Sequence, residues 1–330
     1  MEKTFRALRV YEEEGAFNRR IETRKILELP QGEVLIRVKY SSLNYKDALS
    51  CSGNKGVTRK YPHTPGIDAA GVVEASANME FKPGDEVIVT SYDLGMNTDG
   101  GFAEYIRVPA DWVVLKPQNL SLKQAMVFGT AGFTAGLSVF RLLAAGQKPE
   151  MGPVVVTGAL GGVGSVAVCI LDKLGFEVIA ATSDLKDGED ALKKLGASSR
   201  IDKSETDDQS GRPLLRPKWA GAIDVVGGNI LNTLIKACKP MGNVTCCGNI
   251  GSGDLPGTVY PYILNGISLI GVDSQNCPME IRQKVWDKLA DEWQCECLED
   301  ILKECTLDEL DAYIDKMLNK KSRGRVVVKL

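Results

Sequence analysis

The stretch VVVTGALGGVGSVAV, residues 154–168, is the clearest signal of the fold in this chain. An apolar, β-branched run leads into a glycine-rich turn, and small and apolar residues with helical character follow. Gly161 would let the backbone approach a pyrophosphate, and Gly164 would let the helix pack closely on the strand. The amino terminus of such a helix stabilises phosphate charge. The stretch therefore predicts a strand, a turn and a helix that bind a dinucleotide.

The context of this motif matters, because Ala159 stands where G-x-G-x-x-G has its first glycine. A purely structural glycine turn is the alternative interpretation. From about residue 121, however, strand-like runs alternate with helical segments, which is typical of a parallel sheet. The six strand candidates are residues 154–157, 177–181, 199–202, 222–226, 243–247 and 268–272. We therefore predict a Rossmann domain, a doubly wound parallel six-stranded sheet.

The end of the second predicted strand indicates which cofactor is preferred. A fold that prefers NAD places an acid there for the ribose 2′-hydroxyl, whereas this chain has Thr182. Ser183, Lys186 and Arg200 are close in sequence and suit a 2′-phosphate. Asp184 does not suit one. The pattern favours NADPH over NADH.

The first part of the chain has a different residue pattern. Short runs such as VLIRVKY, residues 34–40, alternate with glycine and proline turns, which indicates a β-rich lobe. After residue 273 an amphipathic helix is expected through residues 281–289, then a helix after Thr306 and a last strand over residues 325–330. We expect two domains in an α/β protein: residues 1–121 with 298–330, and residues 122–297, with a ligand cleft between them.

Composition excludes several classes of function. The net charge is −3 and basic residues do not cluster, so nucleic acid is not an expected partner. No run approaches the roughly 20 apolar residues of a membrane helix, and the first residues lack a signal-peptide core. We expect a cytoplasmic protein that acts on a small molecule and binds no membrane.

Cysteine and histidine usage narrows the chemistry further. The nine cysteines are odd in number and several lie in apolar runs, so we expect reduced thiols and no metal site. The chain has one histidine, His63, in a proline-flanked loop where a solvated side chain is expected. A catalytic triad or a multi-histidine metal site is therefore not predicted.

Taken as a whole, the chain resembles a medium-chain dehydrogenase/reductase, with a GroES-like β-rich catalytic domain and a Rossmann domain. Zinc members of that superfamily carry metal ligands where this chain reads NYKD (residues 44–47), GID (66–68) and FGT (128–130). All but an acid have been replaced, and the four-cysteine zinc loop has no counterpart between Ser91 and Ala103. The resemblance is thus to the zinc-less group, which polarises its substrate by hydrogen bonds.

Within that group the chain resembles the acrylyl-coenzyme A reductase and quinone oxidoreductase family. The matching stretches are SSLNYKDAL (41–49), PGIDAAG (65–71), GTAGFTA (129–135), DVVGG (224–228) and residues 255–274. Five separated matches in family order are specific.

The resemblance implies a set of site residues. Asn44, Tyr45 and Thr130 would line the nicotinamide and substrate end, with Tyr45 also touching the cofactor. The pyrophosphate would lie on Gly161, Gly162, Val163 and Gly164, and the adenosine phosphate would face Thr182, Ser183, Lys186 and Arg200. Other cofactor contacts would come from Asn249, Ile263, Ser274 and Asn319, with a phosphate contact from Arg325.

The implied reaction is hydride transfer from NADPH to the β-carbon of a 2-enoyl thioester such as acrylyl-CoA. A donor would stabilise the enolate oxygen, and Tyr45 or a water would supply the proton. Packing in a β-rich lobe is the alternative role for Tyr45, and capping of a helix is the alternative role for Asp47. Quinone reduction by the same residues stays open, as does a protein that only binds NADPH or contacts RNA.

An oligomer is also expected. Residues 268–274, SLIGVDS, would form the last strand of the nucleotide sheet and leave an apolar edge unless it is paired. Superfamily resemblance implies a homodimer through this strand.

Overall fold

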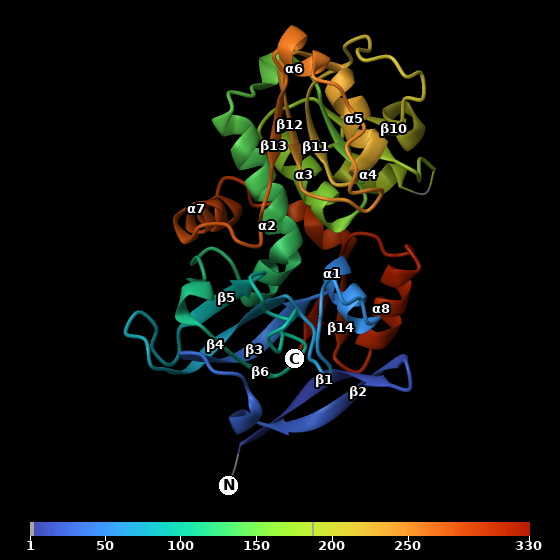
Figure 1. Ribbon diagram of the computed structural model, residues 1–330. Helices are drawn as coiled ribbons and strands as arrows, with labels where there is room; N and C mark the ends of the chain where they lie inside the picture. The colour runs from blue at the N-terminus through green and yellow to red at the C-terminus, as the bar shows by residue number, and fades with distance from the viewer. Residues whose placement is uncertain (1–2, 187) are drawn as a thin grey trace. The chain divides into compact units, whose positions relative to one another are not determined.

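The computed structural model describes residues 3–186 and 188–330 and divides the chain into two compact units (Figure 1). Unit 1 comprises Met1–Thr130, Gln275–Ala290 and Leu302–Leu330, and unit 2 comprises Ala131–Ser274 and Asp291–Ile301. These bounds correct the expected ones, because Gln275–Ala290 belongs to unit 1. Helix α7 (Met279–Ala290) carries the buried Arg282, whose guanidinium donates to the carbonyl and hydroxyl oxygens of Thr90.

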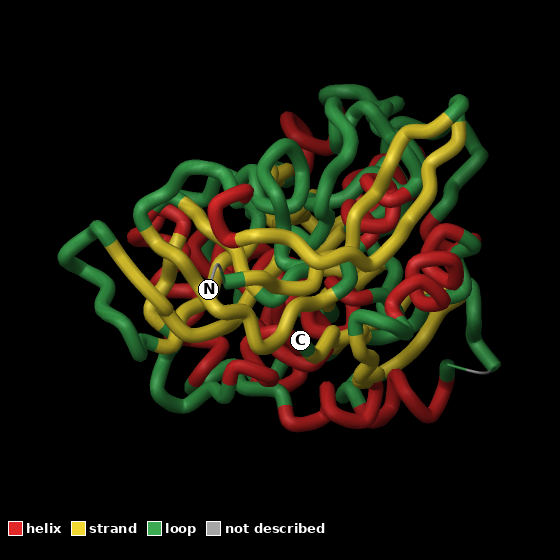
Figure 2. The backbone as a smooth tube through the Cα atoms, turned by 90° about the horizontal axis from the view of Figure 1, so that it is seen from below, coloured by secondary structure: helices red, strands yellow, loops and turns green. Residues whose placement is uncertain are grey.

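Unit 1 is built mainly from strands. β1 (Thr4–Glu13) and β2 (Ala16–Lys25) form a hairpin, which Figure 2 shows as two long yellow strands joined by a tight turn. A second sheet has the order β14-β15-β3-β4-β5-β7, with β6 paired to β3. Its strands are β3 (Val34–Ser42), β4 (Asp68–Ser76), β5 (Glu86–Thr90), β6 (Tyr105–Val108), β7 (Val113–Leu115), β14 (Leu302–Thr306) and β15 (Arg325–Lys329). Apolar side chains that alternate along β3 and β6, such as Val34, Ile36 and Ile106, form its core.

Two further helices complete unit 1. α1 (Tyr45–Cys51) follows β3 directly, and α8 (Leu310–Leu318) precedes β15. The carboxylate of Glu309 accepts hydrogen bonds from the backbone N–H and hydroxyl of Thr306, in the turn that leads into α8. The sequence signal at Thr306 therefore marks this turn, and the helix begins four residues later.

Unit 2 contains one parallel sheet of six strands in the order β10-β9-β8-β11-β12-β13. The strands are β8 (Val154–Thr157), β9 (Val178–Thr182), β10 (Ser199–Asp202), β11 (Trp219–Asp224), β12 (Cys238–Cys246) and β13 (Ser268–Gly271), joined by α3 (Gly162–Lys173), α4 (Glu189–Lys194), α5 (Gly228–Lys236) and α6 (Tyr260–Asn265). β8 consists of three valines and Thr157 and is buried along its whole length, as expected for a central strand of a parallel sheet. The predicted Rossmann sheet is confirmed, since the order reverses beside β8 as in a doubly wound fold.

Helix α2 (Leu122–Ala144) is long and apolar enough to span a membrane by length and composition alone, which the sequence analysis had not expected. Its most apolar window is 78% buried inside the protein, as in the core helix of a globular domain. The helix is also kinked at Gly129, whose φ of 51° and ψ of −155° are not helical.

Two expectations about single residues are wrong. Cys169 of α3 and Cys297 form a disulfide, because the 3-10 helix η5 (Glu296–Ile301) packs against α3, while seven cysteines are free. His63 is buried and exchanges backbone hydrogen bonds with Val10 of β1. Burial lowers the pKa of its imidazole, so the side chain is not a solvated one.

Candidate functional site

A buried hydrogen-bonded cluster in unit 1 surrounds the carboxylate of Asp68, the first residue of β4. Oδ2 of Asp68 accepts hydrogen bonds from the Ser42 hydroxyl at 2.6 Å and from the Asn44 amide at 2.7 Å. Oδ1 accepts the Thr130 hydroxyl at 2.5 Å, and the backbone N–H of Thr130 also points at this carboxylate. One acid thus links the end of β3, the start of α1 and the kink of α2.

The kink at Gly129 exists because this cluster leaves no room for a side chain. A Cβ at Gly129 would lie 2.5 Å from both Asp68 Oδ2 and the Ser42 hydroxyl, and 2.8 Å from Arg325 Nη2. The positive φ is also one that residues with a Cβ rarely adopt. Glycine at this position therefore brings the Thr130 backbone to Asp68.

Arg325, the first residue of β15, completes the cluster and is almost completely buried. Its guanidinium donates to the Val127 carbonyl at 2.7 Å, to the Ser42 hydroxyl at 3.0 Å and to Asn44 Oδ1 at 3.3 Å. Burial lowers the pKa of this guanidinium, and the charges of Asp68 and Asp47 oppose that shift. All three guanidinium nitrogens donate hydrogen bonds to buried groups of the protein. This corrects the expectation that Arg325 contacts a cofactor phosphate.

Helix α1 is fixed at its first turn by Asn44 and Asp47. Asp47 Oδ2 accepts from the backbone N–H of Asn44 at 2.8 Å, and Oδ1 accepts from that of Ile67 at 2.8 Å. Burial and the neighbouring Asp68 raise the pKa of Asp47 to about 7, against the lowering effect of these N–H donors. Asp47 therefore has the capping role that the sequence left open.

Tyr45 differs from its two predicted partners in its exposure. It is the first residue of α1, its side chain is 39% exposed, and no described group hydrogen-bonds to its hydroxyl. The Asn44 amide, in contrast, donates a hydrogen bond to Asp68, and the Thr130 hydroxyl donates a hydrogen bond to the same carboxylate. Of the three residues, Tyr45 has the exposed side chain, while the polar groups of Asn44 and Thr130 are hydrogen-bonded within the cluster.

In unit 2 the glycine-rich turn lies between β8 and α3, as the motif predicts. Gly158 adopts a φ of +58°, a role that the sequence analysis did not assign. A Cβ at Gly164 would collide with the Gly158 carbonyl, so glycine there allows α3 to pack on the turn. Gly161 caps the twelve-residue α3, which begins at Gly162 and continues through Val163. The turn and the exposed helix terminus fit the pyrophosphate of a dinucleotide.

The end of β9 lies in the same unit. Thr182 is buried and its hydroxyl accepts a hydrogen bond from the Asp184 backbone, whereas Ser183 and Lys186 are exposed. Arg200 of β10 is also exposed, and its guanidinium forms an ion pair with Glu189 at 2.7 Å. Hydroxyl groups and cations at this strand end fit a ribose that carries a 2′-phosphate.

The remaining predicted residues are spread over both units. In unit 2, Asn249 is exposed after β12, Ile263 is 68% exposed on α6, and the Ser274 hydroxyl accepts from Thr134 at 2.8 Å. In unit 1, Asn319 ends α8 and donates to the Asp315 carbonyl.

Asp224, which ends β11, is not among the site residues predicted from the sequence. Its buried carboxylate accepts from the Thr157 hydroxyl at 2.8 Å and from the Gly227 backbone at 2.7 Å, and burial raises its pKa. It thereby joins the end of β8 to the turn after β11. Its place in the quoted stretch DVVGG, directly after an apolar strand, was the available signal.

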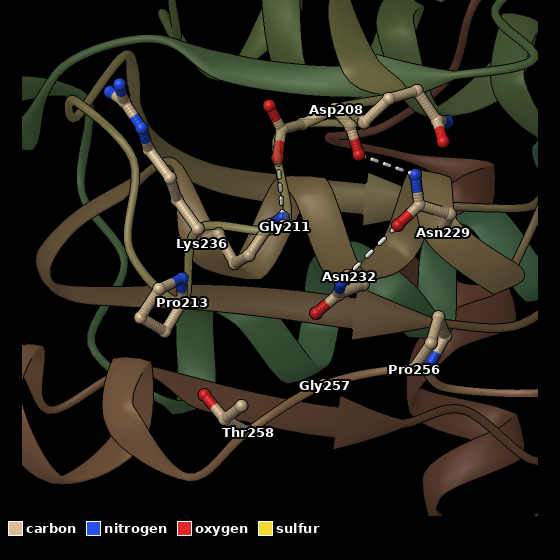
Figure 3. A pocket seen from close by; sticks show the side chains of 11 residues that line it. Asp208, Gly211, Pro213, Asn229, Asn232, Lys236, Pro256, Gly257 and Thr258 are labelled. Carbon is tan, nitrogen blue, oxygen red and sulfur yellow. Dashed lines mark hydrogen bonds and ion pairs between the residues drawn. The ribbon is translucent and has the colours of Figure 1, made fainter.

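Unit 2 also has a polar pocket of about 230 Å³ beside α5 (Figure 3). Its polar groups bond to one another: Lys236 pairs with Asp208 at 2.7 Å, and Asn229 donates to the Asp208 carbonyl at 2.9 Å. None of the predicted site residues lines it, and we assign it no role.

Comparisons with known proteins bear on both units. The alcohol dehydrogenase GroES-like domain model matches residues 30–118, and the zinc-binding dehydrogenase model matches residues 162–291. The chain is 45% identical to "Putative quinone oxidoreductase YhfP" of Bacillus subtilis, over all of both chains. It is 41% identical to the acrylyl-CoA reductase AcuI of Ruegeria pomeroyi, over 96% of each chain. The chain belongs to the medium-chain dehydrogenase/reductase family. It is an oxidoreductase.

Solved structures of relatives agree with this assignment. The crystal structure of YhfP from Bacillus subtilis, with NAD bound, matches with a TM-score of 0.97 over 99% of this chain and 100% of that one. The YhdH oxidoreductase of Salmonella enterica, in complex with NADP, matches with a TM-score of 0.96 at 40% identity over 98% and 99% of the two chains. The expected combination of a GroES-like domain and a Rossmann domain is confirmed.

Zinc does not fit this member of the family. At the positions that correspond to metal ligands, the Asp68 carboxylate is occupied by Ser42, Asn44 and Thr130, with the cationic Arg325 beside them. Thiolates and imidazoles, the usual zinc ligands, do not take part in this cluster. Within the described residues, no group of three or more His, Cys, Asp or Glu could hold a metal ion. The cluster therefore uses hydrogen bonds and a buried arginine in place of metal coordination.

Proposed function

We propose that this chain is a cytoplasmic, NADPH-dependent reductase of activated double bonds, with acrylyl-CoA or a similar 2-enoyl thioester as substrate. The observation that carries the proposal is the exposed side chain of Tyr45, the first residue of helix α1, whose first turn is fixed by Asn44 and Asp47. Reduction of a conjugated thioester needs one oxygen donor and one proton, and no metal. The 41% identity to an acrylyl-CoA reductase supports this substrate class.

In the proposed reaction, the bound cofactor supplies a hydride that adds to the β-carbon of the double bond. Tyr45 donates a hydrogen bond to the thioester oxygen, where negative charge develops, and so stabilises the enolate. A proton from the Tyr45 phenol or from water then adds to the α-carbon. Asn44 and Thr130 hold the start of α1 and the α2 kink against Asp68, which keeps the Tyr45 backbone in place.

NADPH is the proposed cofactor. Thr182 replaces the acid that would select NAD, and Ser183, Lys186 and Arg200 would hold the 2′-phosphate. The pyrophosphate would lie on Gly161, Gly162, Val163 and Gly164, and Asn249, Ile263, Ser274 and Asn319 stay proposed contacts. A relative with NADP supports this choice, whereas the relative with NAD bound makes NADH the necessary control.

Quinone reduction is the second candidate, favoured by the name of the relative with 45% identity. To separate the two, NADPH absorbance is followed with acrylyl-CoA and with 1,4-benzoquinone in parallel, with NADH as the control nucleotide. Rapid turnover of the thioester is the expected result. Turnover of the quinone alone would favour the second candidate, and turnover of neither would leave only a binding function.

A homodimer through β13 is part of the proposal. β13 is the edge strand of its sheet, and the neighbouring α6 region exposes Val259, Tyr260, Ile263 and Leu264 by about half or more of their surface. An apolar patch beside an open strand edge is a usual site of self-association. Light scattering at micromolar concentration should give the mass of two chains, and the mass of one chain would contradict the proposal.

A further inference from the structure

The ion pair between Arg200 and Glu189 bears on how the cofactor is selected. Arg200 lies in β10 opposite Ala180 of β9, two residues before the level of Thr182. Its guanidinium lies 2.7 Å from the carboxylate of Glu189, the first residue of α4. Both side chains are part-exposed, at 39% and 50%. The cation assigned to a 2′-phosphate is thus already held by an acid of the same unit.

A phosphate and a carboxylate compete for the same pair of N–H donors on a guanidinium. An ion pair at this exposure is weak, since water and salt screen it, so a phosphate can displace the carboxylate. The displaced Glu189 then stays close to the phosphate, and two like charges that share one partner repel each other. NADH carries no 2′-phosphate, so its binding is not affected by this competition.

We propose that Glu189 competes with the 2′-phosphate of NADPH for Arg200 and thereby limits the preference for NADPH over NADH. This inference rests on the proposed use of NADPH. Glu189 acts on the discrimination between the two nucleotides and not on the hydride step. The competition is electrostatic, so it weakens as the salt concentration rises.

The test is isothermal titration calorimetry of the full-length protein with 2′,5′-ADP and with 5′-AMP, which differ only in the 2′-phosphate. Glu189→Gln should tighten the binding of 2′,5′-ADP by about three- to tenfold and leave 5′-AMP unchanged. NADPH and NADH, titrated in the same way, should show the same contrast. High salt should reduce the effect of the substitution.

The neighbouring exposed acid provides a matched control. Asp190→Asn removes the same charge from α4 without touching the ion pair, so the ratio of the two Kd values should stay unchanged. In an Arg200→Gln background, Glu189→Gln should lose its effect, because there is no longer a guanidinium to compete for.

Three results would overturn the inference: an unchanged ratio in Glu189→Gln, an equal effect of Asp190→Asn, or a full effect of Glu189→Gln without Arg200. If the wild-type protein binds NADPH and one of these results is found, only the competition is wrong. If the wild-type protein binds neither NADPH nor NADH, the proposed function fails together with the inference.

Discussion

At the scale of single residues, the structure separates the three proposed catalytic positions by what their polar atoms already do. Asn44 and Thr130 donate to Asp68, and among the three residues only Tyr45 is exposed. The sequence could rank Tyr45 first, because its phenol is the nearest proton source in the stretch 44–47 and no histidine is available there. It could not show that Asn44 and Thr130 are committed elsewhere, since Asp68 and Arg325 reach them from distant parts of the chain.

Replacing the Tyr45 hydroxyl tests its role as donor. Tyr45→Phe should lower kcat for the thioester by about 100-fold or more, as expected for loss of a general acid, with little change in the Kd for NADPH. Stopped-flow measurement of NADPH oxidation checks this. Tyr40→Phe, half-buried in β3, is the control. An unchanged kcat in Tyr45→Phe would assign the proton to water.

Gly129 tests the cluster that supports the site. Gly129→Ala should destabilise the protein by about 2–4 kcal/mol, because it combines a strained φ with a clash against Asp68 and Ser42. Gly146→Ala also has a positive φ, but its Cβ would meet open space, so about 1 kcal/mol is expected. Chemical denaturation measures both. Equal losses would mean that the cluster tolerates a side chain at position 129.

At the scale of elements, the sequence predicted the strands and turns that a local pattern of residues determines. The six strands of the parallel sheet and the glycine turn before α3 are confirmed, because buried strands leave apolar runs and the turn takes a positive φ at Gly158. His63 and Arg325 were misplaced because long-range packing, which no local pattern shows, buries them. The Cys169–Cys297 pair likewise depends on η5 meeting α3, over 128 residues of sequence.

The glycine turn before α3 allows a prediction about the affinity for NADPH. Gly164→Ala should raise the Kd for NADPH at least about tenfold, since its Cβ would push α3 away from Gly158. Gly175→Ala, just after α3, meets no neighbouring atom and should leave the Kd unchanged. Fluorescence titration with NADPH distinguishes them. Unchanged binding in Gly164→Ala would remove the turn from the proposed site.

The first turn of α1 predicts a dependence of stability on pH. The pKa of Asp47 is about 7 in the folded chain against an ordinary value of 3.8, so the folded state binds its proton more tightly. The unfolding free energy should therefore be highest below about pH 4 for this group and fall as the pH rises to about 7, by up to a few kcal/mol. Asp47→Asn should lack this slope. Parallel slopes in both proteins would contradict the assignment.

At the scale of the whole molecule, the chain folds into two compact units. Unit 2 contains the glycine turn and the proposed phosphate contacts, and unit 1 contains Tyr45 and the Asp68 cluster. The sequence predicted this division, but it placed α7 in the wrong unit because the buried Arg282 contacts Thr90, far away in sequence. Family membership accounts for the reductase chemistry, and the loss of the zinc ligands is the reason for proposing a conjugated substrate.

The central claim is that hydride passes from NADPH to the β-carbon of an enoyl thioester. The direct measurement is mass spectrometry of the product formed from acrylyl-CoA and NADPH that carries deuterium on the transferred position. The expected product is propionyl-CoA with one deuterium, located on the β-carbon, and with a solvent proton on the α-carbon. Failure to form propionyl-CoA, or a product without deuterium on the β-carbon, would contradict it.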